Sequence, residues 1–69
     1  MNKEELKAEI KDVLSNKPKH IRDGQAIFNY IDEVYGVARK IQYGELIDCF
    51  YDDNQIENFL NKTIEYVNR

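Results

Sequence analysis

Three residue types that act as nucleophiles or bases in enzymes occur once each in this chain of 69 residues, as Ser15, His20 and Cys49. Covalent catalysis requires a nucleophile with a base within hydrogen-bonding reach. Ser15 falls at the end of a predicted helix, His20 in an exposed loop, and Cys49 in an apolar segment where burial is expected. These positions do not predict a catalytic pair, and we expect a protein that is not an enzyme.

Carboxylates offer a second kind of chemistry, because Asp48, Asp52 and Asp53 are close enough in sequence to hold a cation such as magnesium. The run DDNQIEN begins like a calcium loop, but its sixth position is Glu57 instead of glycine and its twelfth is Thr63. The chain has too few cysteine and histidine residues to form a zinc site. It also contains no glycine-rich phosphate loop. Helix capping accounts for Asp52 and Asp53, so we predict no metal and no other cofactor.

A polar edge is the third feature. Arg22, Gln25 and Asn29 follow one another at intervals of three and four residues, so they share one side of a predicted helix. Guanidinium groups bind carboxylates, and side-chain amides satisfy the backbone groups of loops. We therefore expect this edge to face the acidic stretch from Asp48 to Asp53.

Two interpretations of this pairing stay open. In the first, it is a structural clasp that ties the irregular segment 45–54 to the main helix. In the second, the same edge docks onto a partner protein together with Tyr51 and the acidic segment, and a variant has that segment imitating nucleic-acid phosphate. The candidate residues are Arg22, Gln25, Asn29, Asp48, Tyr51, Asp52 and Asp53.

The same two blocks carry a resemblance. The residues RDGQAIFN, from Arg22 to Asn29, and DCFYDDNQIENFL, from Asp48 to Leu60, resemble a pattern of small uncharacterised proteins of bacteria and their phages. That pattern is Arg-x-Gly-Gln-x-x-Phe-Asn, followed downstream by Asp-x-Phe-Tyr-Asp and a closing helix. It spans about two thirds of the chain and omits the N-terminal residues. The resemblance implies that the two blocks belong together and that the chain is phage- or prophage-encoded, and it implies no particular activity.

Apolar spacing predicts the helices that position these side chains. Residues 2–15 have a narrow apolar stripe and open with a capping box formed by Asn2 and Glu5. The second helix begins near Ile21, or as early as Pro18, and ends at Gly36. The apolar face of this helix and its exit turn is predicted to comprise Ile27, Phe28, Ile31, Val34, Tyr35 and Ala38.

The remaining residues complete an all-α prediction. A short helix is predicted over 37–42, and a capping cluster over 52–54 precedes a last helix that runs to about Val67. Residues 45–51 match neither a helical nor a strand period, and we expect an irregular or short helical segment that buries Leu46, Cys49 and Phe50. The predicted fold over residues 1–69 is a single small bundle of three main helices plus a short helix and an irregular segment.

Gly24 falls in the first turn of the predicted second helix, where glycine costs about 1 kcal/mol relative to alanine. Either another backbone or a ligand comes close at this point, or glycine is simply tolerated near a helix end. The sequence leaves both explanations open.

Charge and size narrow the class of protein. The net charge is −3, and residues 41–61 contain five acidic residues and no basic one, which argues against nucleic acid as a partner. The alternative, a DNA- or RNA-associated accessory protein, would use Lys17, Lys19, Arg22, Arg39 and Lys40.

We expect a small interaction or regulatory protein with an unidentified protein partner. The apolar runs are too short for a signal or membrane segment, and a single cysteine fits a reducing compartment, so the expected location is cytoplasmic. A chain this short has a marginal core, and its broad apolar stripe also makes it a candidate homo-oligomer.

Overall fold

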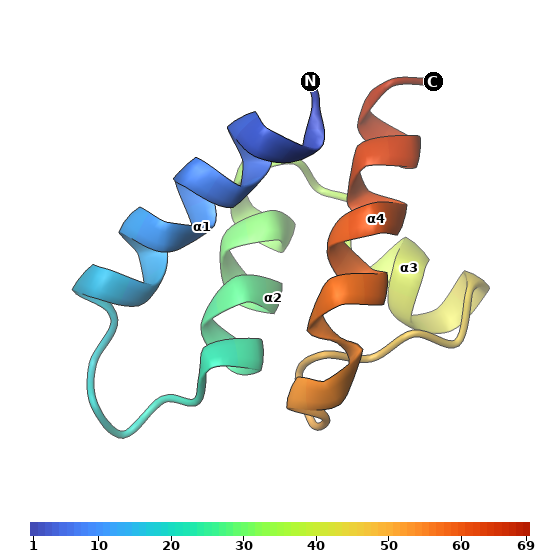
Figure 1. Ribbon diagram of the computed structural model, residues 1–69. Coiled ribbons are helices and arrows are strands. Elements are labelled where there is room, and N and C mark those ends of the chain that lie inside the picture. The colour runs from blue at the N-terminus through green and yellow to red at the C-terminus, as the bar shows by residue number, and fades with distance from the viewer.

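The computed structural model describes all 69 residues and contains helices but no strand (Figure 1). This confirms the all-α prediction. The helices are α1 (Lys3–Asn16), α2 (Asp23–Val34), α3 (Ala38–Gly44), the single-turn 3-10 helix η1 (Asp53–Gln55) and α4 (Ile56–Val67). The chain therefore has four α-helices, and η1 is an addition to the predicted set. None of these helices has the length and apolar character that crossing a membrane requires.

The helices α2 and α4 form the middle of the bundle. Helix α1 packs against both of them, and so does α3, but α1 and α3 do not contact each other. The two therefore cover different sides of the central pair, and the two chain ends lie near each other (Figure 1). The core residues are Leu6, Ile10, Ile27, Phe28, Ile31, Ala38, Ile41, Cys49, Phe59 and Leu60.

The ends of the helices follow from local hydrogen bonds. The predicted capping box is present, because Asn2 Oδ1 accepts the Glu5 amide at 2.8 Å and Asn2 Nδ2 donates to Glu5 Oε1 at 2.9 Å. Helix α2 begins at Asp23, two residues later than Ile21, because the Ile21 amide is used in a turn onto the Pro18 carbonyl. Gly36 follows the end of α2 at φ +69°, the left-handed conformation that glycine adopts most readily.

Two predicted core residues are exposed. Val34, the last residue of α2, has 53% of its surface exposed, although Ala38 of the same predicted stripe lies in the core and Tyr35 packs against it. Leu46 is 86% exposed and adopts φ +57° in the reversal that follows α3. The neighbouring Ile47, together with Phe50, packs against the core instead, and Cys49 is fully buried as predicted.

Candidate functional site

The segment between α3 and η1, residues 45–52, is called the connecting loop below. Its first residue is attached to α4. Lys62 Nζ lies 3.2 Å from Glu45 Oε1, and Tyr66 Oη donates to Glu45 Oε2 at 3.1 Å. The hydrogen bonds from Lys62 and then from Tyr66 lower the pKa of Glu45, so this carboxylate stays charged at neutral pH.

The other end of the connecting loop lies directly against the first turn of α2. A Cβ atom added at Gly24 would be 2.0 Å from the Cys49 carbonyl oxygen and 2.5 Å from Asp53 Oδ1. No side chain fits at such distances, because real Cβ atoms do not approach a backbone oxygen so closely. Of the two explanations for this glycine, close approach of another backbone is therefore the correct one.

Three hydrogen bonds join the start of α2 to the connecting loop and to Asp53, the first residue of η1. Arg22 Nη2 donates to the Phe50 carbonyl at 2.5 Å, the Cys49 thiol donates to the Gly24 carbonyl at 3.4 Å, and the Gly24 amide donates to Asp53 Oδ1 at 3.2 Å. The last bond provides α2 with an N-cap, because Arg22 occupies the N-cap position and its side chain makes no capping bond there. A carboxylate at this helix end is also favoured by the helix dipole.

The structure brings together some of the predicted polar residues and leaves others apart. Arg22 reaches the loop, but it binds a backbone carbonyl where we expect a carboxylate. Gln25 and Asn29 make no hydrogen bond to the loop, and Asn29 is exposed. The hydrogen bonds from this side of the helix therefore come from Arg22 and Gly24 at the start of α2, and not from the rest of the predicted edge.

The remaining predicted aspartates bind within their own segment. Asp48 Oδ1 accepts the Phe50 amide and Asp52 Oδ1 accepts the Asn54 amide, each at 2.9 Å. Asp52 thus caps η1, the turn that precedes α4. No group of three or more His, Cys, Asp or Glu side chains is arranged to hold a metal ion.

Cys49 is held as a neutral thiol. Burial, followed by the negative charge of Asp48, raises the pKa of Cys49 to about 12. A thiol with such a pKa is almost entirely protonated at neutral pH, and the protonated form is the one that donates to the Gly24 carbonyl. In this environment Cys49 contributes packing and a hydrogen bond.

The five tyrosines separate into two groups. Tyr30 and Tyr35 both donate to Glu9 Oε1, at 2.7 and 2.5 Å, and Tyr66 donates to Glu45. Tyr43 and Tyr51 make no such bond, and 75% and 71% of their surfaces are exposed. Only these two therefore have both ring and hydroxyl available to another molecule.

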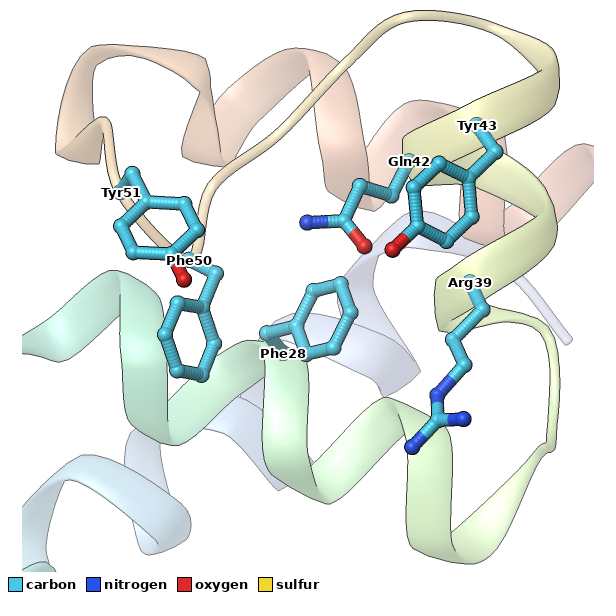
Figure 2. A pocket seen from close by; sticks show the side chains of 6 residues that line it. All are labelled: Phe28, Arg39, Gln42, Tyr43, Phe50 and Tyr51. Atoms are coloured by element: carbon cyan, nitrogen blue, oxygen red, sulfur yellow. The ribbon is translucent and has the colours of Figure 1, made fainter.

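Both free tyrosines border one open pocket, which is called the aromatic pocket below. Its volume is about 390 Å³, and it lies between α2, α3 and the connecting loop (Figure 2). In Figure 2, Tyr51 and Phe50 lie on one side, Tyr43 and Arg39 on the other, and Phe28 between them. The lining residues are Phe28, Arg39, Gln42, Tyr43, Phe50 and Tyr51.

The walls of the aromatic pocket are braced by the core. Phe50 packs edge-on against Phe28, with ring centroids 5.4 Å apart at 82°, and against Tyr51 at 4.8 Å and 66°. Phe28 in turn lies 5.7 Å from the buried ring of Phe59. The floor is therefore continuous with the hydrophobic core, while the rim carries the two exposed phenols.

Arg39 is the one charged residue in the lining. Its side chain is 76% exposed, and its ion pair with Asp32 is long, with Nε 3.9 Å from Oδ1. Exposed pairs of this kind contribute little, so the guanidinium remains able to bind a second carboxylate. Gln42 adds an amide beside it (Figure 2).

Of the pocket residues, the sequence predicted only Tyr51 as a docking residue, and it indicated Arg39 only for the nucleic-acid alternative. The others come from three segments whose spacing in the sequence gives no sign that they meet. Five tyrosines in a short chain indicate a binding surface. The sequence does not show which of them are free, because that depends on the hydrogen bonds that the other three make in the folded structure.

No family model, no curated protein and no solved structure matches this chain.

Proposed function

We propose that this chain is a small non-enzymatic interaction protein that binds a partner protein at the aromatic pocket. The observation that carries the proposal is the pairing of two exposed, unbonded tyrosines, Tyr43 and Tyr51, across an open pocket that also contains Arg39. Tyrosine and arginine are the residue types most enriched at the energetic centres of protein interfaces. Rings beside a concave surface bury a large area at a small cost in conformational entropy.

The contacts between the connecting loop and α2 support this function because they hold one wall of the aromatic pocket in place. Arg22 and Asp53 fasten the loop on which Phe50 and Tyr51 form one wall of the pocket. Binding residues on a loop are effective when a rigid scaffold holds them. The clasp and the docking site are thus parts of one arrangement, in which Tyr51 meets the partner and Arg22 and Asp53 hold the loop.

The resemblance of the two sequence blocks to small proteins of bacteria and phages supports a phage or prophage origin and a bacterial partner. A cytoplasmic location accompanies that origin, since the free thiol of Cys49 is compatible with a reducing environment. A regulatory protein that occupies a surface of the host's machinery would satisfy both points.

Nucleic acid is the weaker candidate because the cations are dispersed. Lys17 binds the Ile21 carbonyl at 2.8 Å and lies 3.4 Å from Asp23, and Arg22 donates to the connecting loop. Arg39 and Lys40 follow the other end of α2, about 18 Å away along a helix of 12 residues. A phosphate-tracking surface needs a continuous row of free cations, so a partner protein is favoured.

The test compares three immobilised baits in a bacterial lysate: the wild-type chain, Tyr51→Ala and Val34→Ala. Val34 is the matched control, because it is also an exposed apolar side chain and does not line the pocket. We expect a protein that the wild-type and Val34→Ala baits retain and that Tyr51→Ala loses, with Kd raised at least tenfold for the purified pair, the loss of about 1.4 kcal/mol typical of an interface anchor.

Circular dichroism should show unchanged melting for Tyr51→Ala, because its side chain is mostly solvated. Capture of the same proteins by all three baits would contradict the proposal. A gel shift with labelled single-stranded RNA that disappears on adding salt would support the nucleic-acid alternative instead.

A further inference from the structure

We propose that a second copy of this chain is the partner that fits the aromatic pocket, with Leu46 of each copy as the side chain that enters the pocket of the other. This inference rests on the proposed function in one respect, which is that the aromatic pocket is a docking surface. Beyond that function, the molecule that binds in the pocket is identified as a second copy of this chain, anchored by Leu46.

Leu46 has two energetically unfavourable features, its backbone conformation and its exposed apolar side chain, that the local structure does not explain. It adopts φ +57°, a left-handed conformation that is strained for a residue with a side chain, and its apolar side chain is 86% exposed to solvent. Glycine or asparagine would adopt this conformation more easily and would expose less apolar surface. A strained residue that presents a large apolar group to solvent indicates a site of contact.

The position of Leu46 matches the pocket. It lies on the connecting loop, three residues after Tyr43 and four before Phe50, and both of these line the pocket. Figure 2 shows that this loop runs along the border of the pocket from the end of α3 to Phe50. The loop that carries the exposed Leu46 also supplies Phe50 and Tyr51 to the pocket, and one two-fold axis would allow each copy to insert its leucine into the other.

Charge supports the same occupant. The only charged residue that lines the pocket is Arg39, whereas residues 41–61, which include Leu46, contain acidic residues and no basic one. A leucine delivered by this segment brings carboxylates toward a guanidinium whose own ion pair is long, with 3.9 Å between Nε and Asp32 Oδ1. A pocket of about 390 Å³ is within the range of sites that hold whole ligands, so it accommodates one leucine side chain.

The size of the chain makes such an association useful. Chains below about 70–80 residues gain little stability from one core and commonly add disulfides, a metal or an oligomeric interface. Cys49 is buried and unpaired, so it forms no cross-link. A contact that covers Leu46, Tyr43 and Tyr51 would remove three of the four large exposed apolar side chains from water.

Sedimentation equilibrium over a range of concentrations tests the inference. We expect the wild-type chain to reach a dimer mass, Leu46→Asp to raise the dimer Kd by at least about thirtyfold, the effect of losing an interface hot spot, and Val34→Asp to leave it unchanged. Val34→Asp introduces the same charge at another exposed apolar residue outside the pocket. A wild-type chain that stays monomeric at every concentration, or equal Kd values for the two variants, would overturn the inference.

Leu46→Gly separates contact from folding. At a concentration below the dimer Kd, where monomers are compared, relief of the left-handed strain should raise the Tm by about 4 °C. The same variant should weaken the dimer, because the anchor is missing. A Leu46→Gly chain that dimerises like the wild type would show that the leucine is not the anchor and would contradict the inference.

The outcomes also distinguish this inference from the proposed function. If the wild-type chain is monomeric and the Tyr51→Ala bait fails to retain a lysate protein that the wild-type bait retains, a second copy is not the occupant of the pocket. The proposal that the pocket is a docking surface would then still hold. If the chain forms a dimer that depends on Leu46, and the Tyr51→Ala bait retains the same lysate proteins as the wild type, a second copy is the occupant of the pocket. The proposal of a separate partner protein would then be contradicted.

Discussion

At Gly24 the backbone of the connecting loop comes closer to a helix than any residue with a Cβ atom allows. The helix propensity of glycine argues for alanine at this position by about 1 kcal/mol. A contact of 2.0 Å between the added Cβ and the Cys49 carbonyl oxygen would be far larger in its effect, since it displaces the loop and its hydrogen bonds. At the residue scale, a close approach therefore outweighs helix propensity.

Gly24→Ala should accordingly destabilise the fold by about 2–4 kcal/mol, through overpacking and the loss of the bonds between α2 and the loop. Gly44→Ala is the matched control, because the nearest atom to its added Cβ is Tyr66 Oη at an ordinary 3.8 Å. It should leave the free energy of unfolding unchanged or slightly higher. Urea denaturation of both variants measures the difference, and equal stabilities would refute the close-approach explanation.

At the scale of elements, the first turn of α2 and the connecting loop stabilise each other. Asp53, which directly follows the loop and begins η1, contributes the carboxylate that caps α2, and Arg22 at the N-cap of α2 holds the Phe50 carbonyl. Helix α1 also contributes to the shared core, because its Leu6 is fully buried. Each element thus completes a neighbour that is distant in the sequence.

Arg22→Ala and Asn29→Ala compare the two ends of the predicted polar edge. Arg22→Ala removes the donor to the Phe50 carbonyl and should cost about 0.5–1 kcal/mol, because the freed carbonyl is solvated. Asn29 is exposed and makes no bond to the loop, so Asn29→Ala should change stability by less than about 0.5 kcal/mol. Thermal melting is the measurement, and a larger loss for Asn29→Ala would show that the clasp extends along the whole edge.

At the scale of the whole molecule, the helices pack into a compact structure. Its radius of gyration is 10.9 Å, compared with about 11 Å expected for a compact chain of this length. The Met1 amino group and the Asn68 side chain also bond to each other, at 3.0 Å. The monomer is therefore expected to fold by itself, so variants at the pocket report on association.

Several protonated groups make the whole fold sensitive to alkali. The pKa of Cys49 rises to about 12 through burial, from an ordinary value of 9.0, and the pKa of Tyr30 rises to about 12 from 10.0, mainly through its hydrogen bond to Glu9. Burial, with the same carboxylate, also raises the pKa of Tyr35. In each case the folded state favours the neutral form, so the stabilisation is complete below the ordinary pKa and is lost as pH rises toward the folded value.

We therefore expect the Tm to be level between pH 7 and about 9 and to fall between about pH 9 and 12. Glu9→Gln removes the negative charge beside both tyrosines, so it should reduce the decrease above about pH 10. Calorimetric scans across this range provide the measurement. A Tm that falls equally in the wild type and in Glu9→Gln would show that the Glu9 cluster does not contribute.

The sequence alone determined those features that depend on residues within about one helical turn. The Asn2–Glu5 capping box, the end of α2 shortly before Gly36 and the all-α class follow from spacing and from conformational preference. The burial of Cys49 was also predictable, because its neighbours are apolar. Such signals are local, so no knowledge of the tertiary contacts was needed.

Only the tertiary structure decided how the connecting loop sits. Asp53 caps a helix 29 residues earlier in the chain, Leu46 turns outward although Ile47 beside it packs against the core, and the aromatic pocket joins three separate segments. The path of a loop is set by the sum of its contacts with distant helices, and sequence spacing does not encode those contacts. The physical reason is that helix periodicity reports which face is buried, whereas the position of a loop depends on how the buried faces are assembled.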